Sequence, residues 1–311
     1  MSVRILATSA LPGGALEALG TRFPELRIAA FRSPAWNEAL GETEALVVLL
    51  SEPLTEEDLA RSPRLTVVAT YSVGVDHLPL GACEARGIRI VNTPDVLTDA
   101  TADLALALLL GLSRRVLEGD ALVRSGAWKG WAPDQLLGTG LAGKTCGILG
   151  AGAIGQAFAK RVWALGMAPA FWDREGRGGA VDFGPARAPR LALDDLLRRS
   201  SVLSLHCPLT PETRGLLDRD SLEKLPAGAM IINTARGGIL DESAALDMLR
   251  AGRLGGAGFD VYDGEPALDP RWREAPRTLL LPHLGSATVE TRSAMAERLC
   301  EGVTAILSSR C

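Results

Sequence analysis

The chain has 311 residues, of which 47% are hydrophobic, and a formal net charge of -4. This length favours two folded domains with large buried cores. The lysines and arginines are dispersed, which argues against nucleic acid or an anionic membrane surface as a partner. No run of 18 apolar residues predicts a membrane span, and the N-terminal segment favours a first strand over a signal peptide.

The cysteines are few and scattered along the chain, at Cys83, Cys146, Cys207, Cys300 and Cys311. Their odd number argues against a disulfide framework, and no C-x-x-C or Cys/His spacing indicates a metal site. We therefore expect free thiols, no bound metal and a cytoplasmic location.

Short apolar runs alternate with helical patterns in the first part of the chain. Strands are expected at residues 3–8, 26–30, 45–50, 65–71 and 88–92, with helices at 11–19 and 55–60 between them. This alternation predicts a parallel sheet with helices on both faces.

A glycine-containing turn, Ser72 to Asp76, follows the fourth of these strands. Ligands of open α/β sheets lie outside the carboxyl ends of the strands. The backbone N–H groups of Val73 and Gly74 are therefore candidates to bind a small anion. An ordinary strand-to-helix turn is the other interpretation.

A long, mostly apolar helix is expected from Leu104 to about Leu117, opened by residues 98–103. A helix that is apolar on nearly all sides is buried on most of them. The segment from Arg124 to Gly140 contains Trp128 and Trp131 together with Gly and Pro, and predicts an ordered excursion. These tryptophans indicate either packing within the chain or a dimer contact.

The stretch Thr145 to Gly155, TCGILGAGAIG, predicts a dinucleotide site. A short apolar strand precedes the glycines of a G-x-G-x-x-G motif, and a helical pattern follows them. Gly150 permits the tight turn, Gly152 lets the backbone approach a pyrophosphate, and Gly155 lets the helix pack on the strand. The start of the helix offers unpaired N–H groups to a phosphate. A glycine-rich turn without a nucleotide is the alternative.

A carboxylate stands where such a site needs one. The apolar segment 167–172 ends at Asp173, about 20 residues past the glycines, where a carboxylate accepts hydrogen bonds from an adenosine ribose. Asp173 favours NAD, because it would repel a 2′-phosphate. Arg174 follows at once and could bind that phosphate in part, so NADP stays possible.

The remaining chain alternates helices and strands in the same way. A loop is expected at residues 174–189, strands at 201–206, 230–233, 258–261 and 279–281, and helices at 191–199, 241–253 and 286–307. We expect two doubly wound parallel-sheet domains, one flavodoxin-like and one Rossmann. The first would comprise residues 1–98 and 286–311, and the dinucleotide-binding domain residues 99–285.

Three groups with complementary chemistry follow strands of this second half: Arg236, Glu265 and His283. Parallel strand ends share one edge, so these groups should meet in one crevice. Arginine presents a planar fork that matches a carboxylate. Histidine exchanges a proton near neutral pH, and a neighbouring glutamate would orient it. Taken singly, each residue has an ordinary structural interpretation.

Several motifs together resemble the D-isomer-specific 2-hydroxyacid dehydrogenase family. They are YSVGVDH, TPDVLTDATADLALALLL, GAGAIG, HCPLTPETRG, NTARGG, GFDVYDGEP and LPHLGSAT, and they span nearly the whole sequence. Residues 93–115 and 134–143 resemble the glyoxylate/hydroxypyruvate reductase branch most.

The resemblance implies roles at matching positions. Arg236 would bind and polarise a 2-oxo acid, His283 would be the acid/base, and Glu265 its partner. Val73 and Gly74 would bind the substrate carboxylate. The implied cofactor positions beyond the glycines and the Asp173-Arg174 pair are Thr101, Ala153, Ile154, His206, Pro208, Thr213, Thr234, Ala235, Asp260 and Gly285.

The resulting expectation is an NAD(P)-dependent reductase of a small 2-oxo acid, with glyoxylate or hydroxypyruvate favoured and a D-2-hydroxy acid as product. The family also implies a homodimer. A dehydrogenase of another branch, acting on D-3-phosphoglycerate or D-lactate, is the first alternative. An NAD-sensing binding protein that recruits partners is the second.

Overall fold

The computed structural model describes residues 3–174 and 178–309, and the chain divides into two compact units. The first comprises Met1–Leu97 with Ser286–Cys311, and the second Thr98–Gly285. Cys311 lies outside the described residues, whereas the other four cysteines are buried free thiols. None of the helices in the described ranges is long and apolar enough to cross a membrane.

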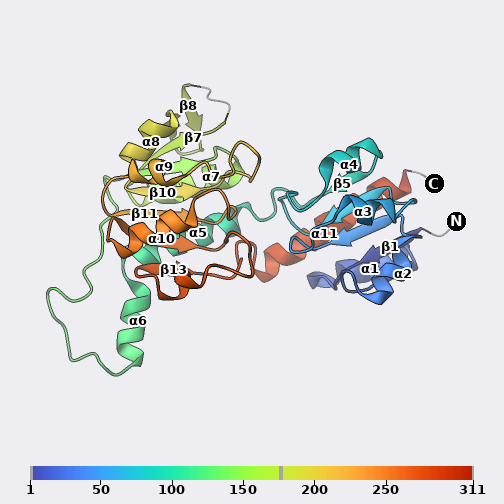
Figure 1. Cartoon of the computed structure of the whole chain (residues 1–311), viewed down its shortest axis with the longest axis horizontal. Coiled ribbons are helices and arrows are strands. Elements are labelled where there is room, and N and C mark those ends of the chain that lie inside the picture. The colour runs from blue at the N-terminus through green and yellow to red at the C-terminus, as the bar shows by residue number, and fades with distance from the viewer. Residues whose placement is uncertain (1–2, 175–177, 310–311) are drawn as a thin grey trace. The chain divides into compact units, whose positions relative to one another are not determined.

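The first unit is built on a five-stranded parallel sheet in the order β2-β1-β3-β4-β5 (Figure 1). Its strands are β1 (Arg4–Ala7), β2 (Glu25–Ile28), β3 (Ala45–Val48), β4 (Val67–Thr70) and β5 (Arg89–Val91). The helical segments are η1 (Pro12–Gly14), α1 (Ala15–Arg22), α2 (Pro34–Leu40), α3 (Glu56–Ala60), α4 (Leu80–Ala85) and α11 (Val289–Ser308). α11 returns from the end of the chain to pack on α1 and β4. Every residue of β3 and β4 is buried, as expected of parallel strands covered on both faces.

The second unit contains a six-stranded parallel sheet in the order β13-β12-β11-β10-β6-β7. The strands are β6 (Thr145–Leu149), β7 (Ala168–Trp172), β10 (Val202–Leu205), β11 (Ala229–Asn233), β12 (Leu254–Phe259) and β13 (Thr278–Leu280). Its helical segments are α5 (Thr98–Ser113), α6 (Val116–Arg124), α7 (Ala153–Ala164), α8 (Leu193–Arg199), α9 (Arg219–Glu223), α10 (Glu242–Arg250) and η2 (Pro270–Glu274). The two sheets confirm the predicted pair of doubly wound α/β domains. The order of the second sheet reverses direction between β6 and β10, and ligands of such sheets bind at this switch point.

The long helix predicted from Leu104 to about Leu117 was wrong at its end. α5 stops at Ser113, and Arg115 adopts a left-handed conformation with φ 54° before α6 begins. The backbone N–H of Thr139 donates to the Ser113 carbonyl at 2.7 Å, so the returning segment caps the helix. α6 and the chain that follows it extend away from the sheet of their own unit (Figure 1).

The loop predicted at residues 174–189 was also wrong in part, although residues 175–177 lie outside the described ranges. β8 (Ala180–Asp182) and β9 (Arg187–Pro189) form an antiparallel hairpin there. Arg190, directly after it, bridges in parallel to Phe171 of β7, so the hairpin lies beside the sheet edge.

The strand predicted at residues 258–261 runs instead from Leu254 to Phe259. Its glycines interrupt the apolar run that usually marks a buried strand, and each of them has a close neighbour in the fold. A Cβ on Gly258 would lie 3.0 Å from the Leu108 Cβ of α5, and one on Gly255 would lie 2.2 Å from the Gly228 carbonyl oxygen. Glycine is required at these positions of the strand because neighbouring backbone and α5 occupy the space that a side chain would need.

Candidate active site

The glycine turn between β6 and α7 has the geometry that a dinucleotide requires. Gly150 has φ 107°, and a Cβ there would lie 2.6 Å from the His206 carbonyl oxygen at the end of β10. A Cβ on Gly155 would lie 2.1 Å from the Gly150 carbonyl oxygen, so the helix packs directly on the turn. Around Gly152 there is open space, and this residue and Ala153 are exposed at the start of α7. The turn therefore leaves room for a phosphate at the helix N-terminus.

Asp173 follows β7 and is held by an arginine that the sequence did not single out. Its Oδ2 lies 2.7 Å from Nε of Arg190, while Oδ1 is buried without a hydrogen-bond partner among the described residues. An unpaired carboxylate oxygen at this strand end fits a ribose hydroxyl, which could donate to it. Arg174 Nη1 donates to Thr210 Oγ1 at 3.4 Å and to Glu212 Oε2 at 3.3 Å.

The hydroxyl and imidazole groups predicted to bind cofactor mostly hold loops at the strand ends. Thr101 Oγ1 donates to the Gly285 carbonyl at 3.1 Å, and Thr213 Oγ1 donates to the Pro208 carbonyl at 2.6 Å. His206 Nε2 lies 2.8 Å from Ser204 Oγ, and burial lowers the pKa of this imidazole to about 3. Two of the predicted cofactor groups also leave a buried atom without a hydrogen-bond partner in the described ranges, namely Nδ1 of His206 and Oγ1 of Thr234.

The structure brings two of the three predicted catalytic side chains into direct contact. His283 Nδ1 donates to Glu265 Oε1 at 2.6 Å, and Glu265 Oε2 accepts from the Tyr262 N–H at 3.2 Å. Burial opposes ionisation of Glu265. The hydrogen bond and charge of His283, together with the charge of Arg236, outweigh burial and hold the pKa of this carboxyl below its usual range.

Asp260 fixes the backbone that presents His283. Its two carboxylate oxygens accept from the N–H groups of Leu284 and Gly285 at 2.6 and 2.8 Å, and its carbonyl accepts from the His283 N–H at 2.9 Å. Burial raises the pKa of Asp260 despite these bonds. His283 has φ 57°, a left-handed conformation that costs about 1 kcal/mol or more for a non-glycine residue. Asp260 therefore acts as the anchor that holds His283 in this conformation.

Arg236 lies on a turn built by Asn233 at the end of β11. The Asn233 side chain donates to the Arg236 carbonyl at 2.9 Å and accepts from the Ala235 N–H at 3.0 Å. Gly237 presses against the next loop so closely that a Cβ would lie 2.0 Å from the Tyr262 carbonyl carbon. The Arg236 loop and the loop that leads to Glu265 are thus packed backbone to backbone.

Val73 and Gly74 lie in the first unit, in the turn after β4, where both are partly exposed. Another side chain near the predicted site, that of Glu242, was not expected from the sequence. Glu242 accepts from Nε1 of Trp272 and from the Asp263 N–H, each at 2.7 Å, and so supports the loop before Glu265. A glutamate in the first turn of a helix gave no signal beyond a favourable helix dipole.

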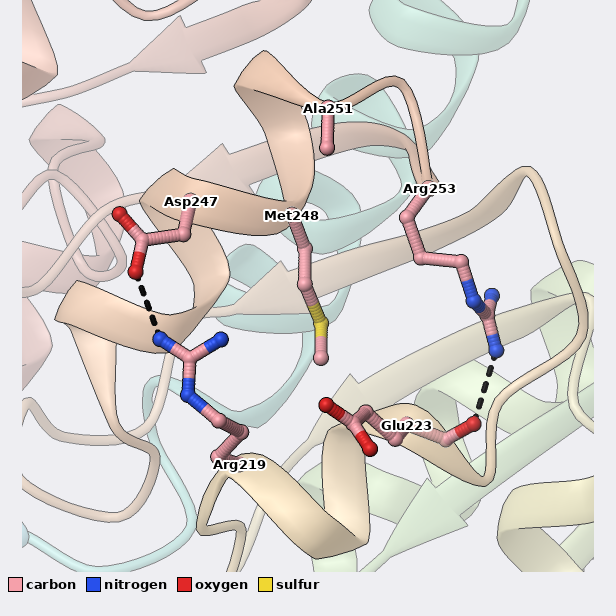
Figure 2. Close-up of a pocket in the computed structure, with 6 residues that line it drawn as sticks. All are labelled: Arg219, Glu223, Asp247, Met248, Ala251 and Arg253. Atoms are coloured by element: carbon pink, nitrogen blue, oxygen red, sulfur yellow. Dashed lines mark hydrogen bonds and ion pairs between the residues drawn. The ribbon is translucent and has the colours of Figure 1, made fainter.

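A pocket elsewhere in the second unit contains none of these residues. It is lined by Arg219, Glu223, Asp247, Met248, Ala251 and Arg253 of α9, α10 and their following turns (Figure 2). Arg219 pairs with Asp247 at 2.6 Å, and Arg253 donates to the Glu223 carbonyl at 2.8 Å. These segments precede β11 and β12, so the pocket lies toward the sheet edge opposite the strand ends described above.

Fold and geometry together define a dinucleotide-binding α/β protein with an imidazole–carboxylate pair at the carboxyl ends of its strands. Residues 106–285 match the family described as D-isomer specific 2-hydroxyacid dehydrogenase, NAD binding domain. The chain belongs to this family of oxidoreductases.

Its relatives agree on the class of enzyme. Glyoxylate reductase from Thermococcus litoralis is 42% identical over 272 residues, which are 86% of this chain and 82% of that protein. Glycerate dehydrogenase from Hyphomicrobium methylovorum is 40% identical over 270 residues, covering 86% and 84%. The NADPH-dependent glyoxylate/hydroxypyruvate reductase from Sinorhizobium meliloti, solved with NADP and malonate, superimposes with a TM-score of 0.87 at 30% identity, covering 99% and 95%.

Proposed function

We propose that the enzyme reduces glyoxylate or hydroxypyruvate to the D-2-hydroxy acid, with NADH as the preferred reductant. The observation that supports this most is the 2.6 Å contact between His283 Nδ1 and Glu265 Oε1. Glu265 occupies Nδ1, so the remaining ring nitrogen, Nε2, is the one that faces outward from the pair. A histidine oriented in this way is a suitable proton donor.

When bound, the reduced nicotinamide supplies a hydride to the carbonyl carbon of the substrate. In the proposed reaction His283 holds a proton at Nε2 and gives it to the developing alkoxide oxygen. Glu265, ionised in this environment, stabilises the imidazolium that precedes this transfer. Arg236 binds the substrate as a planar cation, and Val73 and Gly74 are proposed to bind its carboxylate through their N–H groups.

The preference for NADH rests on Asp173. Its carboxylate would repel a 2′-phosphate and accept from a free 2′-hydroxyl. Arg190 neutralises part of this charge and Arg174 is close in sequence, so NADPH is the second coenzyme to test. The similar reductase from Sinorhizobium meliloti is NADPH-dependent, which gives a specific reason to measure both.

An assay panel of 2-oxo acids with both reduced coenzymes tests this proposal. Glyoxylate and hydroxypyruvate should give the highest kcat/KM, above pyruvate and phosphohydroxypyruvate. A preference for pyruvate or the phosphorylated acid would assign the enzyme to the D-lactate or D-3-phosphoglycerate branch. No reduction of any 2-oxo acid, together with NADH binding and a stable protein partner in a pull-down, would favour the NAD-sensing role.

A homodimer in the cytoplasm belongs to the same proposal. Trp131 and Trp128 in the segment after α6 are 82% and 52% exposed, and large exposed aromatic residues are enriched at interfaces. The buried free thiols are what a reducing compartment maintains. Light scattering of the purified enzyme should give the mass of two chains.

A further inference from the structure

Two neighbouring backbone N–H groups in the turn after β4 are left without an acceptor. Within residues 3–174 and 178–309, no atom accepts a hydrogen bond from the N–H of Val73 or of Gly74. Both residues are partly exposed. Successive N–H groups of this kind form a concavity that binds anions, provided that they point the same way.

Their direction is set by the two residues that follow β5. The Thr93 N–H donates to the Ser72 carbonyl at 2.9 Å, and Asn92 Nδ2 donates to the Val73 carbonyl at 2.9 Å. In a trans peptide the C=O and the N–H point in opposite directions. Holding these two carbonyls toward Asn92 and Thr93 therefore turns the N–H groups of Val73 and Gly74 away from them.

A third bond extends the same arrangement. Ser72 Oγ lies 2.6 Å from the Gly74 carbonyl, to which it donates, and 2.8 Å from Thr70 Oγ1. Thr70 Oγ1 in turn lies 2.8 Å from His77 Nε2. Each carbonyl in the turn from Ser72 to Gly74 thus has its own donor, and the turn is ordered before any ligand arrives.

We propose that Asn92 is a positioning residue for the binding of a carboxylate. It does not contact the carboxylate itself. Its amide holds the Val73 carbonyl, and that bond orients the Gly74 N–H toward the anion. The ligand is a small 2-oxo acid, so the inference rests on the proposed function. A residue that only tied β4 to β5 would stabilise the fold without affecting anion affinity, and this difference can be measured.

The test compares Asn92→Leu, which keeps the approximate volume and removes the donor, with the wild type. Oxalate is the probe, and its affinity for the enzyme–NADH complex is measured by titration calorimetry. KM and kcat for glyoxylate and the Kd of NADH are measured in parallel. We expect KM and the oxalate Kd to rise about tenfold, the loss of much of one charge-assisted hydrogen bond. kcat should stay within about twofold and the Kd of NADH should not change.

Asn37→Leu is the matched control, because Asn37 Nδ2 also donates to a backbone carbonyl of the first unit, that of Ser33 at 2.9 Å. It should leave KM and oxalate affinity unchanged. If Asn92→Leu does not fold, Asn92→Asp keeps the shape and should weaken oxalate further, since it sets a carboxylate at the Val73 carbonyl.

Oxalate affinity within twofold of wild type in a folded Asn92 variant would overturn the inference. So would an equal loss in Asn37→Leu. If the wild type reduces no 2-oxo acid, the proposed function fails on its own. Oxalate titration then still decides: weaker binding in the Asn92 variant supports the anion site, and no binding to wild type refutes it.

Discussion

His283 Nδ1 and Glu265 Oε1 lie 2.6 Å apart, although 18 positions separate them in the chain. This contact predicts that Glu265 acts on turnover by orienting and charging the imidazole. Glu265→Gln keeps the shape but removes the charge, and should lower kcat by about 10- to 100-fold, less than the ~10²–10⁴-fold that a positioned acid itself contributes. NADH affinity, measured by fluorescence titration, should not change. A kcat equal to that of wild type would show that the pair is structural only.

The glycine turn predicts opposite consequences for two substitutions. Gly155→Ala places a Cβ 2.1 Å from the Gly150 carbonyl oxygen, so thermal stability should fall by several degrees. Gly152→Ala meets no atom within 4 Å, so Tm should be kept while the Kd of NADH rises about tenfold or more. Gly20→Ala, a helical position with equal space, is the control: it should leave the Kd of NADH unchanged and should not lower Tm, since alanine favours a helix more than glycine. Similar Tm losses in both motif variants would contradict this division of roles.

The Asp173–Arg190 pair predicts how coenzyme preference can be changed. Asp173→Ser removes the carboxylate that opposes a 2′-phosphate and releases the Arg190 side chain. The ratio of the Kd values of NADPH and NADH should fall about tenfold or more. Asp120→Ser removes a carboxylate paired with Arg124 on α6 and should leave the ratio unchanged. An unaltered ratio in Asp173→Ser would mean that this residue does not select the coenzyme.

Buried His206 predicts a pH dependence of stability. Its pKa falls from 6.5 in the unfolded chain to about 3 in the fold. Between these pH values the unfolded state binds the additional proton, so the free energy of unfolding rises with pH. The contribution of His206 to stability is therefore lost as the pH falls from 6.5 toward 3. The contribution is at most about 1.4 kcal/mol per pH unit. Urea unfolding at pH 6.5 and 5 should show a smaller pH effect in His206→Gln than in wild type. Equal effects in the two proteins would exclude this role.

Much of the fold followed from local pattern. Strands such as Ala45–Val48 and Thr145–Leu149 are short apolar runs because parallel strands are buried on both faces. The first residues of β12 were not predicted, because their glycines reflect the close approach of Gly228 and of α5, which are distant in the sequence. The end of α5 depends on Thr139, 26 positions downstream of Ser113, and no helix propensity reports such a contact.

The candidate site was predictable as a set of strand-end residues, because parallel strands align their carboxyl ends. What could not be predicted is which groups hold it in place. Asp260 was expected at the cofactor, yet both its oxygens hold the backbone beyond His283. Arg190 lies directly after the segment interpreted as a loop, and Asn92 donates a single hydrogen bond to a carbonyl 19 positions away.

The most direct measurement is the oxidation of NADH by hydroxypyruvate, followed in wild type and in His283→Gln, with the chirality of the product determined. The proposed function predicts D-glycerate from the wild type, and a loss of kcat of at least about 100-fold in the variant with NADH affinity retained. L-glycerate as product, or turnover in His283→Gln equal to that of wild type, would contradict it.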